Sequence, residues 1–561
     1  MENRNVLIAI VLSSLVLIFW AVFFQPPPVE RKVDEQKITQ NQETGSPSVD
    51  ENQESIANEI TRDEIISSTK RIKLENQNIK GSISLTGAVI DDVTFKNYNE
   101  NVNGEEKIVF LNPKNSPKEY FIETGWAVGG DEKVKLPLVS TIWKTVGNNV
   151  LTPNNPVTLE WNNGEGLIFT KKIELDDKFL FKITQEIKNN SNKAFQFYPY
   201  AQINRKGKPE GREIYILHLG FLGVFDDELI EESVDDIAEE KFTINSSTGW
   251  LGITDKYWLT ALVPEKNSEF KAEFVANNEK YRANYIIKNS KILNPGSSIN
   301  NEIKTFVGAK EISVIDNYAE RFDIKKFDLT INFGWFYFIV KPLFFVTHYF
   351  FELTGNFGLA IIMLTACARI ILFPLANYSF RSMAKMKVLQ PEIERIKSLN
   401  KSDKVKLQQE TMALFKKERV NPLSGCLVIL PSIPLFFSIY KMLYISIEMR
   451  HQPFYGWISD LSERDPTSLF NLFGLIPWDP PTFLMIGGLP ILFGISMHFQ
   501  TLLNPSVSDP MQRKLFQLMP IFLTVILAGF PSGLCLYWCA NNCLSMIQQW
   551  FIMKRTTVKT V

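Results

Sequence analysis

"MLTACARIILFPLAN", residues 363–377, is an apolar stretch interrupted by a single charge, Arg369. The apolar run extends back to Phe357, and about 20 apolar residues are enough to cross a bilayer as a helix. If that helix enters from outside near Phe357, Arg369 lies about 18 Å inside, at about 1.5 Å per residue. A charge at that depth costs at least about 2.5–3.5 kcal/mol. We therefore expect Arg369 to face a wet cavity or a partner.

Arg369 has an alternative interpretation, in which its side chain extends to the cytoplasmic headgroups. Asn377, at the predicted end of the span, is about 12 Å further along, which is far for one side chain. The central turns of the predicted C-terminal spans contain no Asp or Glu that could pair with it. The sequence thus favours a cavity-facing arginine without an acidic partner. Lys441, near the outer end of its predicted helix, is interpreted as extending to the headgroups.

Apolar runs predict six membrane spans in total. The first, 5–24, includes the 19 uncharged residues 6–24 and no small-x-small cleavage site, so it is interpreted as an uncleaved signal anchor. The aromatic stretch 333–355 holds internal polar residues and is predicted to be an amphipathic helix at the outer interface. The remaining predicted spans are 357–377, 423–446, 482–503, 515–530 and 532–553.

Loop charges predict the orientation of these spans. Loop 378–421 carries 11 Lys and Arg against 5 acids, whereas loop 447–481 carries 2 against 5. Because basic loops stay inside, the first is predicted to be cytoplasmic and the second external. Residues 1–4, the loop 504–514 and the basic tail 554–561 then also lie in the cytoplasm, so both termini are expected inside.

The long polar part between the first two spans differs in charge from the rest. Residues 25–332 carry 38 basic and 48 acidic residues, a net charge of −10, and the remaining residues carry 22 against 13, a net of +9. Two environments are indicated. Residues 25–57 are rich in Pro, Gln, Asn and Glu and are predicted to be a disordered linker. Residues 58–328 are predicted to form a large soluble domain outside the membrane.

Period-two alternation predicts that this domain is built of β-strands. Phe179, Phe181 and Ile183 fall on one side of one run. In 270–287, alternate residues from Phe270 to Phe274 and from Tyr281 to Ile287 flank a turn at Asn277-Asn278, which predicts a hairpin with one buried face. Many such runs indicate a large antiparallel sandwich. A closing helix is expected within 311–326.

Metal and cofactor sites are not expected. Cys535, Cys539 and Cys543 share a helix face, but they lack nearby further ligands and are interpreted as small packing residues. The other two cysteines, Cys367 and Cys426, also lie in the apolar half, so the polar domain holds no disulfide. The acidic run 226–240 lacks ligand spacing and is interpreted as a solvated loop or helix face.

Polar residues in the predicted spans suggest a hydrophilic groove around Arg369. Thr365 precedes Arg369 by four residues and shares its face. The alternative is that these polar groups hydrogen-bond between helices. The last span carries a polar stripe at helical spacing, and the third and fourth spans add further candidates: Asn541, Asn542, Ser545, Gln548 and Gln549, then Ser432, Ser438, Ser496, His498 and Gln500.

The cytoplasmic loop 378–421 is predicted to be a helical hairpin with a basic surface. Apolar residues recur every three or four positions on either side of the turn "LNKSDK". The alternative is a plain connector, but 44 residues are many for that role. Basic surfaces of this kind suit ribosomal RNA or anionic lipid headgroups.

No enzyme motif is present: there is no phosphate loop, no Gly-x-Ser-x-Gly and no His-Glu-x-x-His. A solute transporter or channel remains an alternative, but the common transporter folds show two similar halves with broken helices, which are not evident here. A passive assembly scaffold would not need a buried charge.

Several motifs resemble the YidC/Oxa/Alb family of membrane-protein insertases over about 333–553. The matching stretches are "NFGLAIIMLTACARIILFPL", "MAKMKVLQPEIERIK", "ERVNPLSGCLVILPSIPLFFSIYKML", "WISDLSERDP", "DPMQRKLFQLMPIFLTV" and "FPSGLCLYWCANNCLSMIQQ". The anchor and outer domain match the Gram-negative branch by architecture. The resemblance implies a multi-pass α-helical protein of the bacterial inner membrane, with a five-helix insertase core and a large periplasmic all-β domain of β-supersandwich type.

The resemblance also implies a function and partners. The family inserts nascent membrane proteins and helps them fold or assemble, alone or with the Sec translocon (SecYEG, SecDF), and needs no cofactor. Its groove arginine matches Arg369, and Thr365, Asn541, Asn542 and Ser545 are expected beside it. The residues that contact substrates match Ile433, Phe436, Tyr537 and Trp538. The cytoplasmic hairpin and basic tail are expected to meet the ribosome or the signal recognition particle receptor, and the spans to meet membrane lipids.

Overall fold

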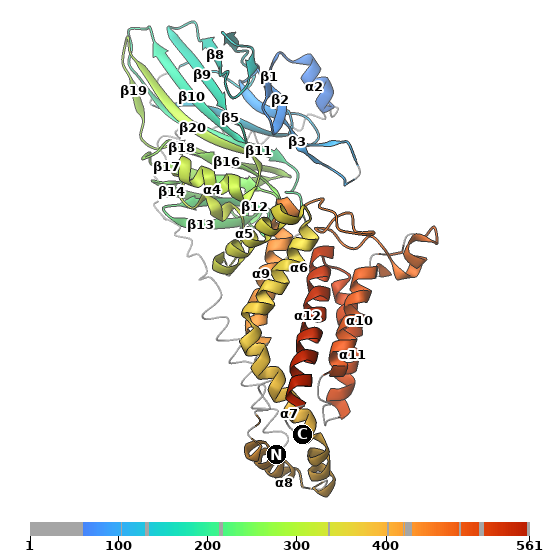
Figure 1. Ribbon diagram of the computed structural model, residues 1–561. Coiled ribbons are helices and arrows are strands. Elements are labelled where there is room, and N and C mark those ends of the chain that lie inside the picture. The colour runs from blue at the N-terminus through green and yellow to red at the C-terminus, as the bar shows by residue number, and fades with distance from the viewer. Residues whose placement is uncertain are drawn as a thin grey trace. The chain divides into compact units, whose positions relative to one another are not determined.

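A computed structural model describes residues 60–557, except 103, 130–133, 212–216, 335–336, 401–402, 419, 421–428, 479, 482–483 and 504–509. All described residues belong to one compact unit, Gly45–Val561. The predicted N-terminus 1–4, anchor 5–24 and linker 25–57 lie outside the described residues, as do Cys426 and the end of the basic tail. The described chain has a large β-rich domain followed by a helical C-terminal region (Figure 1).

The β-rich domain contains two large sheets. The first has 11 strands, with β14-β17-β18-β11-β5-β3-β2-β1-β7 as neighbours, β19 beside β11 and β4 beside β3. Its pairings are antiparallel except that of β1 with β7, which is parallel. The strands are β1 Arg71–Glu75, β2 Ile79–Ser84, β3 Val89–Asn99, β4 Lys107–Leu111, β5 Tyr120–Val128, β7 Val150–Leu151, β11 Phe195–Lys206, β14 Phe242–Ser246, β17 Phe270–Asn277, β18 Lys280–Ile287 and β19 Lys291–Leu293.

The second sheet has 9 strands in the order β13-β12-β15-β16-β20-β10-β9-β8-β6. Long central strands such as β10 and β20 pair antiparallel over nine residues, from Leu180↔Phe306 to Lys188↔Ser298. Its strands are β6 Lys144–Val146, β8 Val157–Asn162, β9 Leu167–Leu175, β10 Leu180–Asn189, β12 Gly220–Phe225, β13 Glu228–Ser233, β15 Gly249–Thr254, β16 Trp258–Val263 and β20 Ser298–Ala309.

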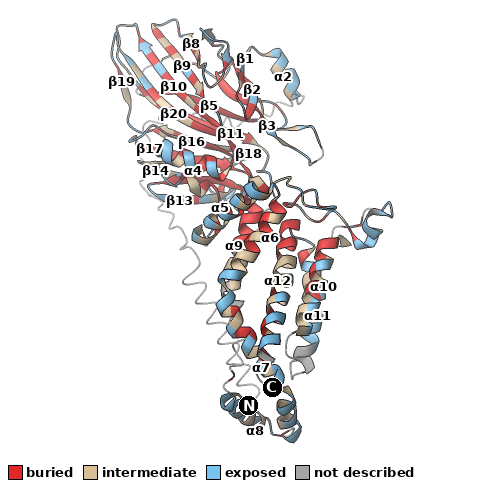
Figure 2. Cartoon of the chain, in the orientation of Figure 1, coloured by how far each residue is buried: buried red, intermediate tan, exposed pale blue. Residues whose placement is uncertain are grey.

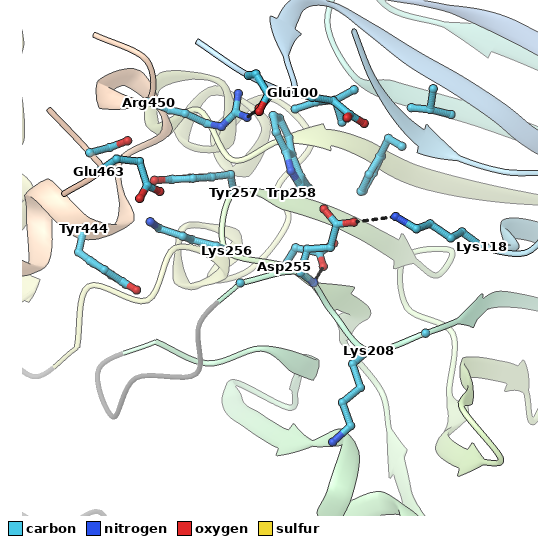
Figure 3. A pocket seen from close by; sticks show the side chains of 18 of the residues that line it. Glu100, Lys118, Lys208, Asp255, Lys256, Tyr257, Trp258, Tyr444, Arg450 and Glu463 are labelled. Carbon is cyan, nitrogen blue, oxygen red and sulfur yellow. Dashed lines mark hydrogen bonds and ion pairs between the residues drawn. The ribbon is translucent and has the colours of Figure 1, made fainter. Parts of the chain in front are cut away.

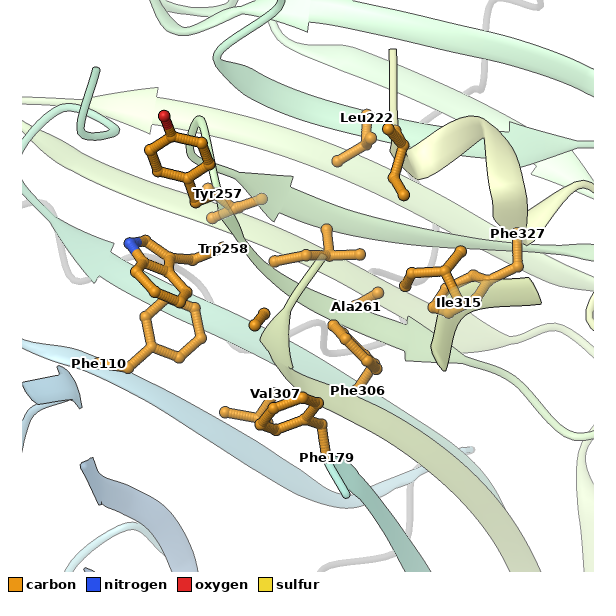
Figure 4. Close-up of a cluster of buried hydrophobic side chains, with 14 of the residues drawn as sticks. Phe110, Phe179, Leu222, Tyr257, Trp258, Ala261, Phe306, Val307, Ile315 and Phe327 are labelled. Atoms are coloured by element: carbon orange, nitrogen blue, oxygen red, sulfur yellow. The ribbon is translucent and has the colours of Figure 1, made fainter. Parts of the chain in front are cut away.

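Aromatic side chains join the inner faces of the two sheets. Phe95 of β3 stacks on Trp258 of β16 with ring centroids 4.6 Å apart, and Phe221 of β12 stacks on Phe274 of β17 at 5.0 Å. Such ring contacts contribute about 0.5–1.5 kcal/mol beyond the burial itself. Figure 4 shows part of this core, with Phe179 beside Phe306. The domain is therefore held by apolar packing across a sandwich.

The predicted hairpin is confirmed with a small shift in its turn. β17 and β18 pair antiparallel from Phe270↔Ile287 to Asn277↔Lys280, and the alternating residues on both strands are buried. The two turn residues are Asn278 and Glu279, one position later than expected, with φ of 46° and 61°. Two consecutive positive φ angles are typical of the tight type I′ turn, which matches the twist of paired strands.

The helices of the described chain lie mostly after the sheets. Helix α4 closes the β-rich domain inside the expected 311–326, and the acidic run 226–240 forms strand β13 and the short helix α3 rather than one solvated element. The helices are α2 Arg62–Ser68, α3 Val234–Glu239, α4 Ile312–Arg321, α5 Tyr337–Thr354, α6 Phe357–Ile371, α7 Phe373–Leu399, α8 Lys404–Lys417, α9 Ile429–Ile445, α10 Gly488–Leu503, α11 Pro510–Leu527 and α12 Ser532–Thr557, with 3-10 turns η1 Phe327–Thr330, η3 Ile447–Met449 and η4 Leu469–Gly474.

The predicted single span 357–377 is instead divided by a bend. Helix α6 ends at Ile371, and α7 begins at Phe373 at an angle of 69° to it. Pro374 in the first turn of α7 explains the break, because proline lacks the N–H that would continue the preceding hydrogen-bond ladder. Helix α7 then continues to Leu399, well into the segment predicted as the hairpin 378–421, whose second helix is α8.

Candidate substrate-contact site

Arg369 lies in the last turn of α6, just before the bend. Its Nε donates to the side-chain oxygen of Asn541 on α12 at 3.0 Å, and its Nη2 donates to the same oxygen at 2.6 Å. The backbone oxygen of Asn541 accepts a longer bond of 3.4 Å from Nη2. Arg369 is half-buried. The guanidinium is thus held by an amide, at the point where α6 meets α12.

Asn541 satisfies hydrogen bonds of Arg369 but does not neutralise its charge. Within the described part of the chain, no carboxylate lies within ion-pair distance of Arg369. A carboxylate adds charge attraction to the hydrogen bond and can accept two parallel bonds from a guanidinium, which strengthens the contact. The arrangement therefore leaves a cation that an incoming carboxylate could hold better than Asn541 does.

The other residues predicted to line a groove here are used differently. Thr365 is 1% exposed, and its hydroxyl donates to the Ile361 carbonyl of its own helix at 2.7 Å. Asn542 donates to Ser496 Oγ on α10 at 3.0 Å, and Ser545 accepts from Gln500 at 3.2 Å. The structure thus brings Asn541 to Arg369, whereas Thr365 bonds within its own helix and Asn542 and Ser545 bond to α10.

The polar stripe of α12 is split between two neighbours because successive helical residues point about 100° apart. Asn541 faces α6, whereas Asn542, Ser545 and Gln549 follow one another at three- and four-residue spacing and face α10. Gln549 completes this second row by donating to the Leu503 carbonyl at 3.3 Å. Most of the stripe therefore hydrogen-bonds between helices, the alternative that the sequence left open.

The aromatic residues predicted to contact substrates form one cluster between α9 and α12. The ring of Phe436 lies 5.0 Å from that of Trp538 and 6.4 Å from that of Tyr537. Tyr537 is buried and Trp538 is partly buried, while Ile433, one turn earlier on α9, is 46% exposed. The structure thus gathers three of these residues and leaves Ile433 on the surface beside them.

Two residues that the sequence prediction did not single out extend this cluster. Phe493 of α10 meets Trp538 edge-on at 5.8 Å, and Tyr440 of α9 stacks on Phe436 at 6.2 Å. The signal for Tyr440 was the four-residue spacing from Phe436. Phe493 had no such signal, because its contact depends on how α10 packs.

Exposed residues recur along several of these helices (Figure 2), and many of them are apolar. On α10, Phe499 is 55% and Leu502 is 62% exposed; on α11, Ile521 is 65% and Phe522 is 64% exposed. Contiguous exposed apolar surface of this kind marks contact with a partner or a lipid phase. Among the described residues, no single helix has the length and apolar composition to cross a membrane, although the bent pair α6–α7 meets those two criteria together.

Two family models cover most of the chain. A model described as the YidC periplasmic domain matches residues 71–346, and one described as 60Kd inner membrane protein matches 349–559. The chain is 53% identical to "Membrane protein insertase YidC" of Pelagibacter ubique over 100% of both chains. The chain belongs to the YidC family. YidC proteins of Bradyrhizobium diazoefficiens (41% identical, covering 100% of this chain and 97% of that one) and Rickettsia felis (43%, covering 98% and 100%) are further relatives.

Membership in the YidC family has direct consequences. The chain is a bacterial inner-membrane protein, and the expectation that it is not an enzyme is confirmed, because the relatives are named as insertases.

A solved structure described as an active YidC insertase is 16% identical, covers 86% of this chain and 92% of its own, and has a TM-score of 0.36. A galactose mutarotase related enzyme from Lactobacillus acidophilus is 12% identical, covers 42% and 97%, and has a TM-score of 0.29.

Proposed function

We propose that this chain inserts integral proteins into the bacterial inner membrane and helps them fold or assemble. The family membership supports insertion of nascent membrane proteins, and one observation carries the mechanism. The Arg369 guanidinium sits between α6 and α12 with an amide, not a carboxylate, as its acceptor. A client's hydrophilic segment, above all an acidic one, can take the place of Asn541 on this cation.

The step needs no nucleotide in this proposal. A polar groove around Arg369, open to cytoplasm and lipid, shortens the apolar barrier that the hydrophilic segment must cross. Transfer of the client's apolar segment into lipid contributes about 0.8 kcal/mol per buried CH₂. The membrane potential adds about 2.3 kcal/mol for each charge moved through 100 mV. Both terms act on the client, so the protein only has to lower the barrier.

The client's apolar segment would leave along α9 and α12. Ile433 offers an exposed aliphatic side chain there, and Phe436 lies behind it against Tyr537 and Trp538. An aromatic and aliphatic surface binds any apolar helix without selecting a sequence. The exposed apolar faces of α10 and α11 suit a position in lipid.

The topology belongs to the proposal as well. Helices α6, α9, α10, α11 and α12 would form the five-helix core, α5 would lie at the outer interface, and the β-rich domain would be periplasmic. The anchor 5–24 adds a sixth span, which leaves both termini cytoplasmic. The α7–α8 hairpin and the basic tail would meet the ribosome or the signal recognition particle receptor, and the Sec translocon would share some clients.

The test is insertion by the full-length protein with Arg369→Ala in proteoliposomes. The client is a single-span protein made in two forms, with an acidic tail and with the same tail neutralised. Arg369→Lys keeps the charge, and Arg321→Ala removes an exposed arginine of α4 as a matched control. We expect Arg369→Ala to reduce insertion of the acidic form most, and Arg321→Ala to leave it unchanged. Undiminished insertion of the acidic form by Arg369→Ala would overturn the role given to Arg369.

A further inference from the structure

A cavity of about 1240 Å³ lies where the β-rich domain meets the helical region. Its walls come from strand β4, the end of β11, the segment before β16, the end of α9 and the turn between α11 and α12. Arg369, Ile433, Phe436, Tyr537 and Trp538 do not line it, and of the cluster around Phe436 only Tyr440 does. Figure 3 shows Lys256 and Tyr257 beside Tyr444 and Glu463, with Lys118 across the cavity.

Specific contacts fix the two parts that form this cavity. Arg450, which follows η3, donates to the carbonyl of Asn99 at 2.8 Å and to that of Glu100 at 3.1 Å, both at the end of β3. Glu448 accepts from the backbone N–H of Ile312 at the start of α4, at 3.0 Å. The cavity is therefore a built feature between anchored walls and not a gap between loose parts.

The charge of the walls favours an anion. Arg205 and Asp255 form a buried ion pair with bonds of 2.8 and 2.9 Å and cancel each other. Lys208 also lines the cavity but is paired with Asp235, which does not, at 2.8 Å. The other described lining residues have five bases, Lys118, Lys206, Lys256, Arg450 and Arg464, against three acids, Glu100, Glu210 and Glu463. This excess is opposite to the net negative charge of the domain that supplies Lys118, Lys206 and Lys256. A concave site with one excess sign concentrates its field on a ligand of the other sign.

A chain of ring contacts links this cavity to the substrate-contact site. Tyr440 stacks on Phe436 of that site and also lines the cavity, where Phe530 meets it edge-on at 5.5 Å. Tyr444 lies one turn further, 6.1 Å from Tyr440, and Lys256 lies 4.2 Å above the Tyr444 ring. One aromatic surface thus runs from Phe436 on α9 to a lysine of the β-rich domain.

We propose that this cavity binds the acidic, hydrophilic peptide segment of a client after that segment has passed the substrate-contact site. The inference rests on the proposed insertase function, because the cavity would be a second binding site for the same client. The acids Glu100 and Glu463 lie among the bases, which disfavours one compact, doubly charged phosphate group. An extended peptide can instead place separate carboxylates beside separate lysines and its backbone against the rings.

The experiment measures peptide binding by the full-length protein in nanodiscs of phosphatidylcholine. The probe is a short fluorescent peptide of alternating Asp and Ser, and the matched peptide has Asn in place of Asp. The double variant Lys118→Gln with Lys256→Gln removes one base from each side of the cavity. The control variant, Lys172→Gln with Lys266→Gln, removes two exposed lysines of the same domain that do not line it. We expect about tenfold weaker binding of the Asp peptide by the cavity variant, and unchanged binding by the control.

Each result decides the proposal. Weaker binding at raised salt and by the Lys118→Glu single variant, which alters an exposed side chain and spares the fold, supports it. Equal affinity for the Asn peptide, or equal losses in the two double variants, overturns it. Displacement of the peptide by glycerophosphoglycerol at lower concentration than by unlabelled Asp peptide would identify a lipid headgroup as the occupant and also overturn it. Insertion by Arg369→Ala separates this proposal from the proposed function. If Arg369→Ala impairs insertion but the native protein does not bind the Asp peptide, only the proposal for the cavity is refuted.

Discussion

Asn541 on α12 accepts two hydrogen bonds from Arg369 on α6 through a single side-chain oxygen. This contact joins two residues that are 172 positions apart in the chain and holds a cation on the helix that carries Tyr537 and Trp538. Asn541 therefore acts as a neutral acceptor that positions the guanidinium. In the proposed mechanism it is also the group that a client's carboxylate displaces.

Asn541→Ala is expected to reduce insertion of an acidic-tailed client less than Arg369→Ala does. Loss of a hydrogen bond to a charged group costs about 1.5–3 kcal/mol, but here the charge itself remains available to the client. Because Asn541 acts only through Arg369, the double variant should insert no less than Arg369→Ala alone. The measurement is a double-mutant cycle on insertion yield.

The cycle has a matched control in Asn542→Ala, the neighbouring amide that faces α10 instead. Its combination with Arg369→Ala should be additive, since the two groups share no contact. Additive losses for Asn541 as well would mean that Asn541 contributes independently of the arginine, contrary to the proposed displacement.

The bond from Asn542 to Ser496 is expected to stabilise the pairing of α12 with α10 without affecting which clients are inserted. Hydrogen bonds between membrane helices contribute about 0.6 kcal/mol on average and about 1.7 at most. Asn542→Ala and Ser496→Ala should each lower the unfolding free energy in bicelles by about that amount, and the double variant by less than their sum. A changed preference for acidic over neutral clients would contradict a purely structural role.

Tyr537→Phe is expected to retain insertion, whereas Tyr537→Ala should reduce it. The ring of Tyr537 stacks near Phe436, and such contacts contribute about 0.5–1.5 kcal/mol beyond burial. The phenylalanine variant preserves the ring and removes only the hydroxyl. Photocrosslinking from Phe436 to a client during its synthesis provides the measurement. Equal losses in the two variants would show that the hydroxyl, not the apolar ring, matters.

Period-two alternation predicted the β-rich domain well because each strand carries its own signal. The residues from Phe270 to Ile287 alternate between core and surface whatever strand lies beside them. The turn was misplaced by one residue because Asn277 and Asn278 both suit it, and only the pairing of Asn277 with Lys280 distinguishes them. The strand order and the parallel pair β1–β7 are set by contacts between distant segments. Alternation within a single strand does not predict these contacts.

The candidate site was predictable only in part, for a related reason. Arg369 is recognisable in the sequence as a charge in an apolar run. Its hydrogen-bond acceptor lies on another helix, so the sequence does not show which residue it is. Sequence spacing grouped Asn541 with Asn542, whereas the packing of α12 between α6 and α10 separates them. The bend after Ile371 could have been anticipated from Pro374, since a proline in that position breaks the helix before it.

Glu448 offers a test of how the β-rich domain is attached to the helical region. One oxygen of its carboxyl group accepts from the backbone N–H of Ile312, and the other is buried without a hydrogen-bond partner among the described residues. Burial raises the pKa of Glu448 from 4.5 to about 7, and the nearby Glu311 acts in the same direction. The folded protein therefore favours the neutral form of this group.

Glu448→Gln is expected to make the stability of the protein less dependent on pH between about 4.5 and 7. As the pH rises through this window, the carboxyl ionises in the unfolded chain but stays protonated in the folded one, so stability falls and then levels off above about pH 7. The loss is about 3–4 kcal/mol over this window, at about 1.4 kcal/mol for each pH unit. Melting temperatures measured across pH should decline in the native protein and in Glu320→Gln, which alters an exposed acid of α4, but stay flatter in Glu448→Gln. The same decline in all three proteins would show that Glu448 is not the group that titrates.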